Sequence, residues 1–218
     1  MSGVVLVDDT PVTKAGSPVK EDSVIRIKGG GDPGYVSRGA LKLAPALESF
    51  DVNPAGRICM DVGASTGGFT EILLQGDATR VYAIDVGYGQ MAWRIRNDER
   101  VVVLDRTNAR HLSDEQVPEQ VSLVVVDVSF ISVTLLIDAI KSRCAEKADL
   151  LIMVKPQFEV GKGQVGKGGI VRDESKRQGA IDSVIEFAGT KGLQLLNRRD
   201  NDITGAQGNL ETFLHFRT

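Results

Sequence analysis

Apolar runs of strand length recur along the chain from residue 57 onward. Their residues are continuous Val, Ile and Leu rather than apolar residues alternating with polar ones, which is typical of parallel strands buried on both faces. An acid or a lysine follows the apolar part of several of these runs. The runs are 57–63 (RICMDVG), 80–87 (RVYAIDVG), 100–107 (RVVVLDRT), 121–130 (VSLVVVDVSF) and 149–156 (DLLIMVKP).

Segments with helical spacing of apolar residues separate these runs, namely 67–77, 89–98 and 133–145, and 173–192 follows the last one. Alternating strands and helices predict an α/β domain with a doubly wound, mostly parallel sheet. At the end of the chain, 193–204 and 208–218 have extended or alternating patterns around a short turn. We expect these two segments to form an antiparallel strand pair at the sheet edge.

The start of the chain has a different pattern. Residues 3–28 hold short β-type pieces with turn signals, and 29–34 (GGGDPG) has the composition of a flexible linker. Residues 35–50 predict a helix with Ser37 as N-cap and a kink or interruption at Pro45. We therefore expect a small N-terminal part (1–28), a linker (29–34) and one main domain (35–218).

Composition narrows the class of protein. The chain of 218 residues is 42% hydrophobic and 25% charged, which is ordinary for a globular protein. No apolar run approaches the ~18 residues of a membrane span, and the first residues lack a secretory signal, so we expect a cytoplasmic location. Cys59 and Cys144 each lie in an apolar segment with no C-x-x-C or Cys/His cluster, which predicts core residues and no metal site.

The charge distribution bears on possible partners. A formal net charge of −3 argues against a protein that coats nucleic acid indiscriminately, because such binders are usually basic overall. Residues 155–177 nevertheless carry a local excess of Lys and Arg over acids. This excess indicates either a local basic face or an ordinary solvated surface.

The loop after the first of these strands predicts a ligand. Its glycines, Gly63, Gly67 and Gly68, have neither the G-x-G-x-x-G spacing of dinucleotide sites nor the Lys-Ser/Thr pair of a P-loop. Asp61 precedes the loop and suits a cationic amine, and Asp85 ends the next strand at the place of a ribose-binding acid. A ligand with an amino-acid end and a nucleoside end fits both carboxylates, which indicates S-adenosylmethionine.

The alternative for Asp61 and Asp85 is that they cap helices or face solvent, which we consider less favoured at this edge of the sheet. After the third strand, Asp105, Thr107 and Asn108 are candidates for adenine recognition, although the last two could equally form a turn. The residues expected to contact the cofactor are Asp61, Gly63, Ser65, Thr66, Gly67, Gly68, Phe69, Asp85, Val86, Asp105, Thr107 and Asn108.

Two further strand ends carry charges, Asp127 and Lys155. Their strands should deliver both side chains to the same sheet edge as the ligand. Desolvating a lysine there is costly unless the lysine is paired or used. The two residues could form a structural ion pair or take part in chemistry.

Five motifs, in this order and spacing, resemble the TlyA or haemolysin A family of ribosomal RNA methyltransferases, relatives of the FtsJ-like 2′-O-ribose methyltransferases. The likeness runs from about Tyr35 to the end of the chain. It implies a Rossmann-like class I fold that uses S-adenosylmethionine, and ribosomal RNA or ribosomal subunits as substrate. The motifs are SRGALKL (37–43), DVGASTGGFT (61–70), DVSFIS (127–132), VKPQFE (154–159) and GNLETFLHF (208–216).

The resemblance also implies a catalytic tetrad of Lys42, Asp127, Lys155 and Glu211. In-line attack of a ribose 2′-hydroxyl on a sulfonium methyl needs the hydroxyl deprotonated and held close to the methyl carbon. Lys155 is the candidate for activating the hydroxyl, with Asp127 orienting it and the other two positioning the ribose. Without the resemblance, Lys42 and Glu211 would pass for a helix-surface lysine and a strand-edge glutamate.

Residues 3–28 resemble the second half of the small α-L RNA-binding domain that precedes the methyltransferase in this family. Its usual first helices are missing from the sequence, which indicates a fragment or a mis-started reading frame. The glycine-rich segment 156–171, with Lys162 and Lys167, is either a mobile basic lid that meets RNA phosphates or a surface loop. Two other functions stay open: a haemolysin-like membrane-active protein and a small-molecule methyltransferase.

Overall fold

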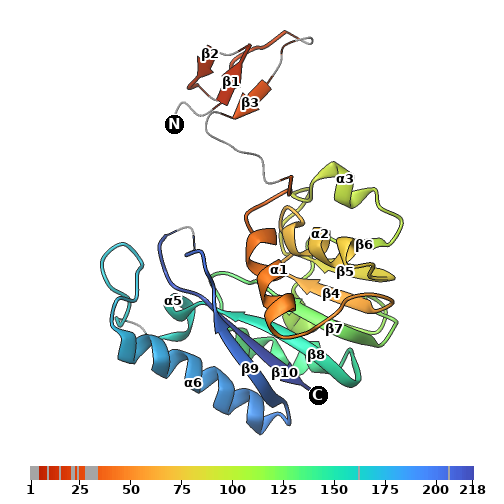
Figure 1. Cartoon of the computed structure of the whole chain (residues 1–218), viewed down its shortest axis with the longest axis vertical. Helices are drawn as coiled ribbons and strands as arrows, with labels where there is room; N and C mark the ends of the chain where they lie inside the picture. Colours follow the sequence, from red (N-terminus) through yellow and green to blue (C-terminus); the bar gives the residue numbers. More distant parts are fainter. Residues whose placement is uncertain are drawn as a thin grey trace. The chain divides into compact units, whose positions relative to one another are not determined.

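The chain forms two compact units, Met1–Tyr35 and Val36–Thr218, in a computed structural model. The structure describes residues 5–8, 10–14, 16–20, 23, 25–27, 34–161, 163–205 and 207–218. Most of the expected linker, 29–33, therefore lies outside the described residues. Figure 1 shows the elements of both units along the chain.

The first unit contains a three-stranded antiparallel sheet in the order β2-β1-β3. The strands are β1 (Val5–Val7), β2 (Thr10–Val12) and β3 (Ile25–Ile27). Central strand β1 pairs with both neighbours, Leu6 lying opposite Pro11 on one side and Arg26 on the other. The β-type pieces expected in 3–28 are therefore present as strands.

The second unit is built on a seven-stranded sheet in the order β6-β5-β4-β7-β8-β10-β9 (Figure 1). Five strands run parallel, and β10 is antiparallel to both of its neighbours. The doubly wound sheet and the C-terminal antiparallel pair are confirmed. The strands are β4 (Ile58–Val62), β5 (Arg80–Ile84), β6 (Val101–Leu104), β7 (Val121–Val126), β8 (Cys144–Val154), β9 (Gln194–Asp200) and β10 (Thr212–Arg217).

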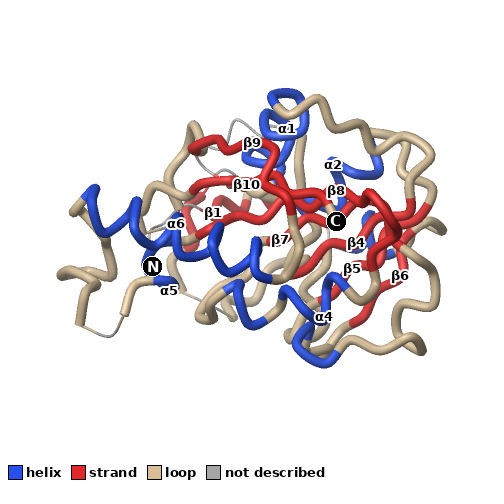
Figure 2. The backbone as a smooth tube through the Cα atoms, turned by 90° about the horizontal axis from the view of Figure 1, so that it is seen from below, coloured by secondary structure: helices blue, strands red, loops and turns tan. Residues whose placement is uncertain are grey.

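Helices cover both faces of this sheet, as Figure 2 shows from below. On one face, Phe69 of α2 packs against Phe213 of β10 with ring centroids 5.9 Å apart. On the other, Ile137 of α4 and Ile181 of α6 join the apolar cluster around the central strands. The helical elements are α1 (Ala40–Ser49), α2 (Gly68–Gln75), α3 (Trp93–Arg96), η1 (Ala109–His111), η2 (Val133–Leu135), α4 (Ile137–Lys141), α5 (Pro156–Glu159) and α6 (Glu174–Thr190).

The strand order places a crevice between β4 and β7. From β4 the chain continues outward to β5 and β6, and it then returns to the other side of β4 at β7. At such a reversal the two loops that follow the strands leave in opposite directions, which opens a ligand-binding space at the carboxyl edge. The glycine loop follows β4 and Asp127 follows β7, so both lie at this crevice.

Two helices are shorter than the segments over which they were predicted. Of 89–98 only Trp93–Arg96 is helical, because the segment leaves β5 through a turn in which Gly89 has φ +64°. Of 133–145 the helix ends at Lys141, and Cys144 already pairs with Val121 as the first residue of β8. Cys144 is consequently half-buried in a strand, whereas Cys59 is buried in the core as expected.

Helix α1 differs from the expectation at its start, and it is not interrupted at Pro45. It begins at Ala40, after Gly39 as N-cap, so Ser37 is not the N-cap. The Ser37 hydroxyl instead accepts the Gly39 N–H at 3.2 Å in the turn before the helix. Pro45 lies inside the helix, which continues to Ser49. The proline costs the helix one backbone hydrogen bond but does not end it.

Among the described residues, no helix has both the length and the apolar composition that crossing a membrane requires.

Candidate active site

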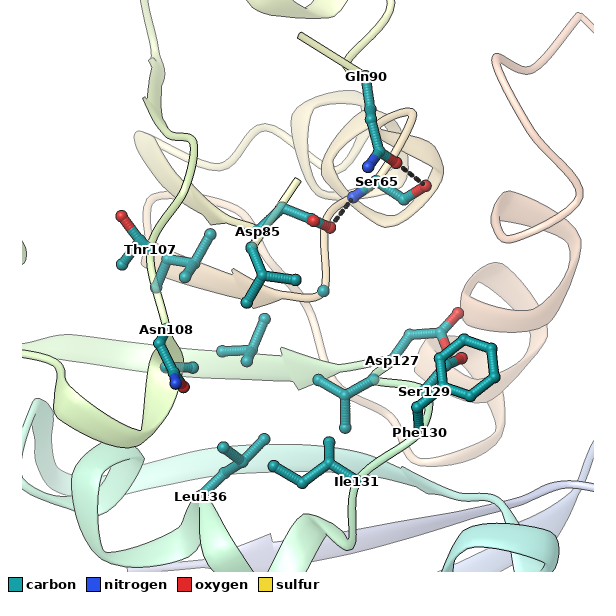
Figure 3. A pocket seen from close by; sticks show the side chains of 16 residues that line it. Ser65, Asp85, Gln90, Thr107, Asn108, Asp127, Ser129, Phe130, Ile131 and Leu136 are labelled. Carbon is teal, nitrogen blue, oxygen red and sulfur yellow. Dashed lines mark hydrogen bonds between the residues drawn. The ribbon is translucent and has the colours of Figure 1, made fainter. Parts of the chain in front are cut away.

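Two adjoining cavities open at the carboxyl edge of the sheet. The larger, with a volume of about 340 Å³, extends from Thr107 and Asn108 to Asp127 and Ser129 (Figure 3). The second, of about 240 Å³, lies toward α1. Gly63, Ser65 and Asp127 border both, so the two cavities meet at the β4 and β7 strand ends. We call them the cofactor cavity and the acceptor cavity.

The glycine loop needs its glycines for two different reasons. Gly63 has φ +90°, and a Cβ there would overlap the backbone carbonyl of Asp127. Gly67 has φ +95° and is the N-cap of α2 in the left-handed region, which favours glycine. The loop therefore turns tightly between β4 and α2, and it leaves the backbone close to the cavities.

Asp85 is built into the wall of the cofactor cavity. Its Oδ2 accepts the Ser65 N–H at 2.8 Å and its Oδ1 accepts the Gly87 N–H at 2.7 Å. Each carboxylate oxygen has a second lone pair, so both remain able to accept from hydroxyl groups of a ligand. The Ser65 hydroxyl bonds to Gln90, and Figure 3 shows both contacts beside the cavity.

Most of the other residues predicted to bind the cofactor line one of the two cavities, and one of them does not. Val86, Thr107 and Asn108 line the cofactor cavity, and Thr66, Gly68 and Phe69 line the acceptor cavity. Asn108 also accepts the Arg110 N–H and so caps η1. Asp105 lines neither cavity; it pairs with Arg96 at 2.9 Å.

Asp61 lies beneath the glycine loop rather than in a cavity wall. Its side chain is fully buried, and its Oδ2 accepts the Thr70 hydroxyl at 2.7 Å. In the described part of the chain its Oδ1 has no hydrogen-bond partner. Burial, followed by the charges of Asp127 and Asp85, raises the pKa of Asp61 to about 7 despite the Thr70 hydrogen bond. Its contact with a cofactor amine stays a prediction.

The four residues of the predicted tetrad form two ion pairs. Lys42 Nζ lies 2.6 Å from Glu211 Oε2, and Lys155 Nζ lies 2.6 Å from Asp127 Oδ1. Lys42 and Asp127 line the acceptor cavity together, so the two pairs border one space. Helix α1 contributes the first residue and strand ends contribute the other three, although up to 169 positions separate partners in the sequence. The structure therefore brings all four together.

Sequence reasoning missed several residues at the cavities. Ser129 and Phe130, two and three residues after Asp127, line the cofactor cavity, and Phe130 is 88% exposed. Arg38 and Thr204 line the acceptor cavity, and an Arg38 Nη2 donates to the Thr204 carbonyl at 3.3 Å. Ser129 and Phe130 belong to the strand-end motif DVSFIS, which was the available signal, whereas nothing local marks Thr204.

The glycine-rich segment after Lys155 is partly described. Lys162 lies outside the described residues, and Lys167 is exposed. Asn209, which is buried, accepts the Val171 N–H at 3.0 Å and donates to the Gly169 carbonyl at 2.8 Å. These bonds tie the end of the segment to the connection that leads into β10. Its function as a lid over RNA stays a prediction.

Gly205 sets the position of the Glu211 carboxylate. A Cβ at residue 205 would overlap Glu211 Oε1. Because a carboxylate at the end of a flexible side chain can move aside, Gly205→Ala should keep the fold and shift this carboxylate away from Lys42. We expect a loss of about tenfold in kcat for the reaction proposed below, with unchanged affinity for S-adenosylmethionine.

Gly179→Ala is the matched control for this prediction, because a Cβ at this position of α6 meets nothing within 4 Å. Steady-state kinetics and calorimetric titration of both variants check the expectation. An alanine at 205 that leaves kcat unchanged would mean that the Glu211 position is not critical.

Comparison with known proteins identifies the family of the chain. Residues 35–218 match the FtsJ-like methyltransferase family. The 16S/23S rRNA (cytidine-2′-O)-methyltransferase TlyA of Mycobacterium tuberculosis is 46% identical over 217 residues, which cover 100% of this chain and 81% of the relative. Hemolysin A of Brachyspira hyodysenteriae is 37% identical, over 99% of this chain and 90% of its own.

Solved structures give the same picture. A Streptococcus thermophilus protein with a provisional hemolysin name has a TM-score of 0.85 at 35% identity, covering 100% of this chain and 80% of its own. The N-methyltransferase NodS of Bradyrhizobium japonicum, in complex with S-adenosylhomocysteine, has a TM-score of 0.58 at 19% identity, over 80% and 84% of the two chains. The latter likeness concerns the fold, which is the class I methyltransferase fold. With 184 of its residues matched by that one family, the chain belongs to the FtsJ-like methyltransferases.

Proposed function

We propose that this protein transfers a methyl group from S-adenosylmethionine to a ribose 2′-hydroxyl of ribosomal RNA. The observation that carries this proposal is the pair of ion pairs, Lys155 with Asp127 and Lys42 with Glu211, at the junction of two cavities. The 2′-O activity printed for the Mycobacterium tuberculosis relative supports it. Because ribosomes are the implied substrate, we also propose a cytoplasmic location.

The cofactor cavity fits S-adenosylmethionine by the chemistry of its wall. Asp85 offers carboxylate oxygens for ribose hydroxyls, and Thr107 and Asn108 at the far end offer polar groups for a base. Gly63 and Ser65 keep the loop close at the other end. When bound, the cofactor supplies a methyl group on a sulfonium, whose bonding electrons stay on sulfur after transfer.

The two ion pairs have different roles in the proposed reaction. An acceptor ribose in the second cavity would meet Lys42 and Asp127 in its wall. As the 2′-oxygen forms its bond to the methyl carbon, Lys155 Nζ accepts the hydroxyl proton, and Asp127 stabilises the resulting ammonium. Glu211, only 3% exposed, holds Lys42 in place for the ribose.

Asp85→Ala should weaken S-adenosylmethionine binding by about 10- to 100-fold, because it removes hydrogen bonds to a charged acceptor. Calorimetric titration of the purified protein measures this directly. Asp105→Ala is the control, since Asp105 follows the neighbouring strand but lines neither cavity, and we expect a change below about threefold there. Equal losses in the two variants would contradict the placement of the ribose at Asp85.

A membrane-active function has a specific observation in its favour, the name Hemolysin A of one relative. Purified protein free of detergent, incubated with red cells, tests it. We expect no lysis at concentrations that methylate ribosomal RNA. Lysis that survives Lys155→Ala would establish a second activity, independent of methyl transfer.

The first unit would contribute RNA contacts. Its three short strands occupy the segment that resembles the second half of an α-L RNA-binding domain. We propose this function on that resemblance. Deleting residues 1–34 should raise the KM for ribosomal RNA while S-adenosylmethionine affinity stays unchanged.

Transfer of labelled methyl to ribosomal subunits and to their naked RNA tests the proposed function. One alkali-resistant linkage in the labelled RNA would identify a 2′-O product. Label in small-molecule acceptors, with none in RNA, would assign the protein to a different substrate class.

A further inference from the structure

We propose that Ser129 is a positioning residue that sets the direction of the Lys155 amine during methyl transfer. The inference rests on the proposed function, in which this amine accepts the hydroxyl proton. Lys155 Nζ donates to Ser129 Oγ at 2.8 Å while it lies 2.6 Å from Asp127 Oδ1. The lysine is therefore held by two oxygens, and only one of them belongs to the predicted tetrad.

The two contacts constrain the amine differently. In the described structure Asp127 Oδ1 has no hydrogen-bond partner, so its contact with Lys155 is an attraction between charges. Such an attraction fixes a distance but hardly an angle, whereas a hydrogen bond weakens steeply away from linearity. The contact with Ser129 is a hydrogen bond. Ser129 thus orients the amine, and the third position on Nζ is left for the substrate.

The surroundings place Ser129 at the point where this orientation matters. Ser129 and Asp127 both line the cofactor cavity, as Figure 3 shows, whereas the Lys155 side chain is 11% exposed and lines neither cavity. The amine contacts Asp127, which borders both cavities, and Ser129, which borders the cofactor cavity. The direction of the amine relative to the cavities decides whether its lone pair faces the ribose hydroxyl.

The loop that carries Ser129 is anchored at both ends. At its start the Asp127 N–H donates to the Val62 carbonyl at 2.9 Å. At its end Glu159 accepts the Ser132 hydroxyl at 2.5 Å and the Val133 N–H at 2.9 Å. Burial raises the pKa of Glu159 in spite of these two hydrogen bonds.

Between these anchors the backbone is strained. Phe130 has φ +67°, a conformation that costs a residue with a side chain about 1–3 kcal/mol and persists only where neighbours enforce it. Its ring packs on Phe158 with centroids 5.2 Å apart. A loop held this way supports a fixed position for the Ser129 hydroxyl.

Ser129→Ala should lower kcat for RNA methylation by about 10- to 100-fold, while the Kd for S-adenosylmethionine and the KM for RNA stay within about twofold. Ser129→Thr keeps the hydroxyl and should recover most of the lost kcat. Ser142→Ala is the control, since this exposed hydroxyl at the end of α4 donates to the Ala139 carbonyl and accepts from Arg143 Nε, and it lines neither cavity. Thermal unfolding of each variant checks that the fold is kept.

A second measurement does not depend on methyl transfer. The rate at which an activated ester acylates Lys155, read by peptide mass spectrometry, should rise at least threefold in Ser129→Ala and return toward the wild-type rate in Ser129→Thr. Wild-type kcat and an unchanged acylation rate in Ser129→Ala would overturn the proposal. A loss of cofactor affinity that parallels the loss of kcat would also overturn it, because Ser129 would then be a cofactor contact.

The two proposals fail in different ways. If the unsubstituted protein methylates no ribosomal RNA, the proposed function fails, and the acylation rates still decide whether Ser129 orients Lys155. If the unsubstituted protein is active and Ser129→Ala matches it, only the inference on Ser129 fails.

Discussion

Replacing Lys155 by alanine is expected to reduce methyl transfer to ribosomal RNA by about 10³-fold or more. General-base catalysis by a positioned side chain contributes about 10²–10⁴-fold, and this variant removes both the base and the partner of Asp127. Because Lys155 lines neither cavity, the affinity for S-adenosylmethionine should change by less than about threefold. Single-turnover transfer of labelled methyl and calorimetric titration measure the two quantities separately.

Lys155→Arg distinguishes a base from a fixed charge at this position. An arginine keeps the positive charge beside Asp127, but its guanidinium stays protonated and cannot accept a proton. We expect this variant to be as inactive as the alanine variant. An arginine variant with a tenth or more of the normal rate would mean that the cation acts by electrostatics alone. Lys176→Ala, an exposed lysine on α6, should behave like the unsubstituted protein.

The sequence predicted the sheet and its carboxyl edge because buried parallel strands have an unambiguous pattern. The run 121–130, for example, contains strand β7, which begins at Val121 as expected and ends at Val126, the last residue before Asp127. Each such strand also delivers the residue after it to the ligand-binding edge, so Asp85, Asp127 and Lys155 could be placed there before any coordinates. The edge of the sheet therefore follows from local pattern alone.

Elements that depend on distant partners could not be predicted in the same way. Local periodicity extends the helix after η2 to residue 145, whereas pairing with Val121 draws Cys144 into β8. The same limit applies at the site, where Lys42 of helix α1 meets Glu211, the residue before strand β10, at 2.6 Å. Only the family resemblance identified them. Ser129 lies in the motif DVSFIS, but the motif does not tell which of its polar side chains contacts Lys155.

Asp149→Asn is expected to destabilise the protein by about 3 kcal/mol and to leave catalysis per folded molecule unchanged. Asp149 lies in the middle of β8, whereas Lys155 follows the last residue of this strand. The carboxylate is 6% exposed, and its oxygens contact His215 Nε2 at 2.9 Å, Arg217 Nη2 at 2.7 Å and Arg57 Nη1 at 2.9 Å. A neutral amide leaves the two partly buried arginines, Arg57 and Arg217, without their counter-charge, which is the costly step.

The contribution of Asp149 to the free energy of unfolding should depend on pH. Burial alone would raise the pKa of Asp149, but the hydrogen bonds from His215, Arg217 and Arg57 outweigh it and hold the pKa below the ordinary value. A carboxyl whose folded pKa is depressed contributes stability above its unfolded pKa of about 4 and loses it as the pH falls toward the folded value. The difference in unfolding free energy between Asp149→Asn and the unsubstituted protein should therefore be full at pH 7 and shrink below about pH 4.

Denaturant unfolding at several pH values measures that difference, and Asp138→Asn is its control. The Asp138 side chain is 69% exposed in an ion pair with Lys191, so its loss should cost less than about 1 kcal/mol at every pH. An Asp149→Asn variant as stable as this control would mean that the buried cluster is neutral for stability. We expect the polar groups at the carboxyl ends of the strands to serve the reaction and Asp149 to serve the fold alone. A variant that lost methyl transfer without losing stability would contradict this assignment of Asp149.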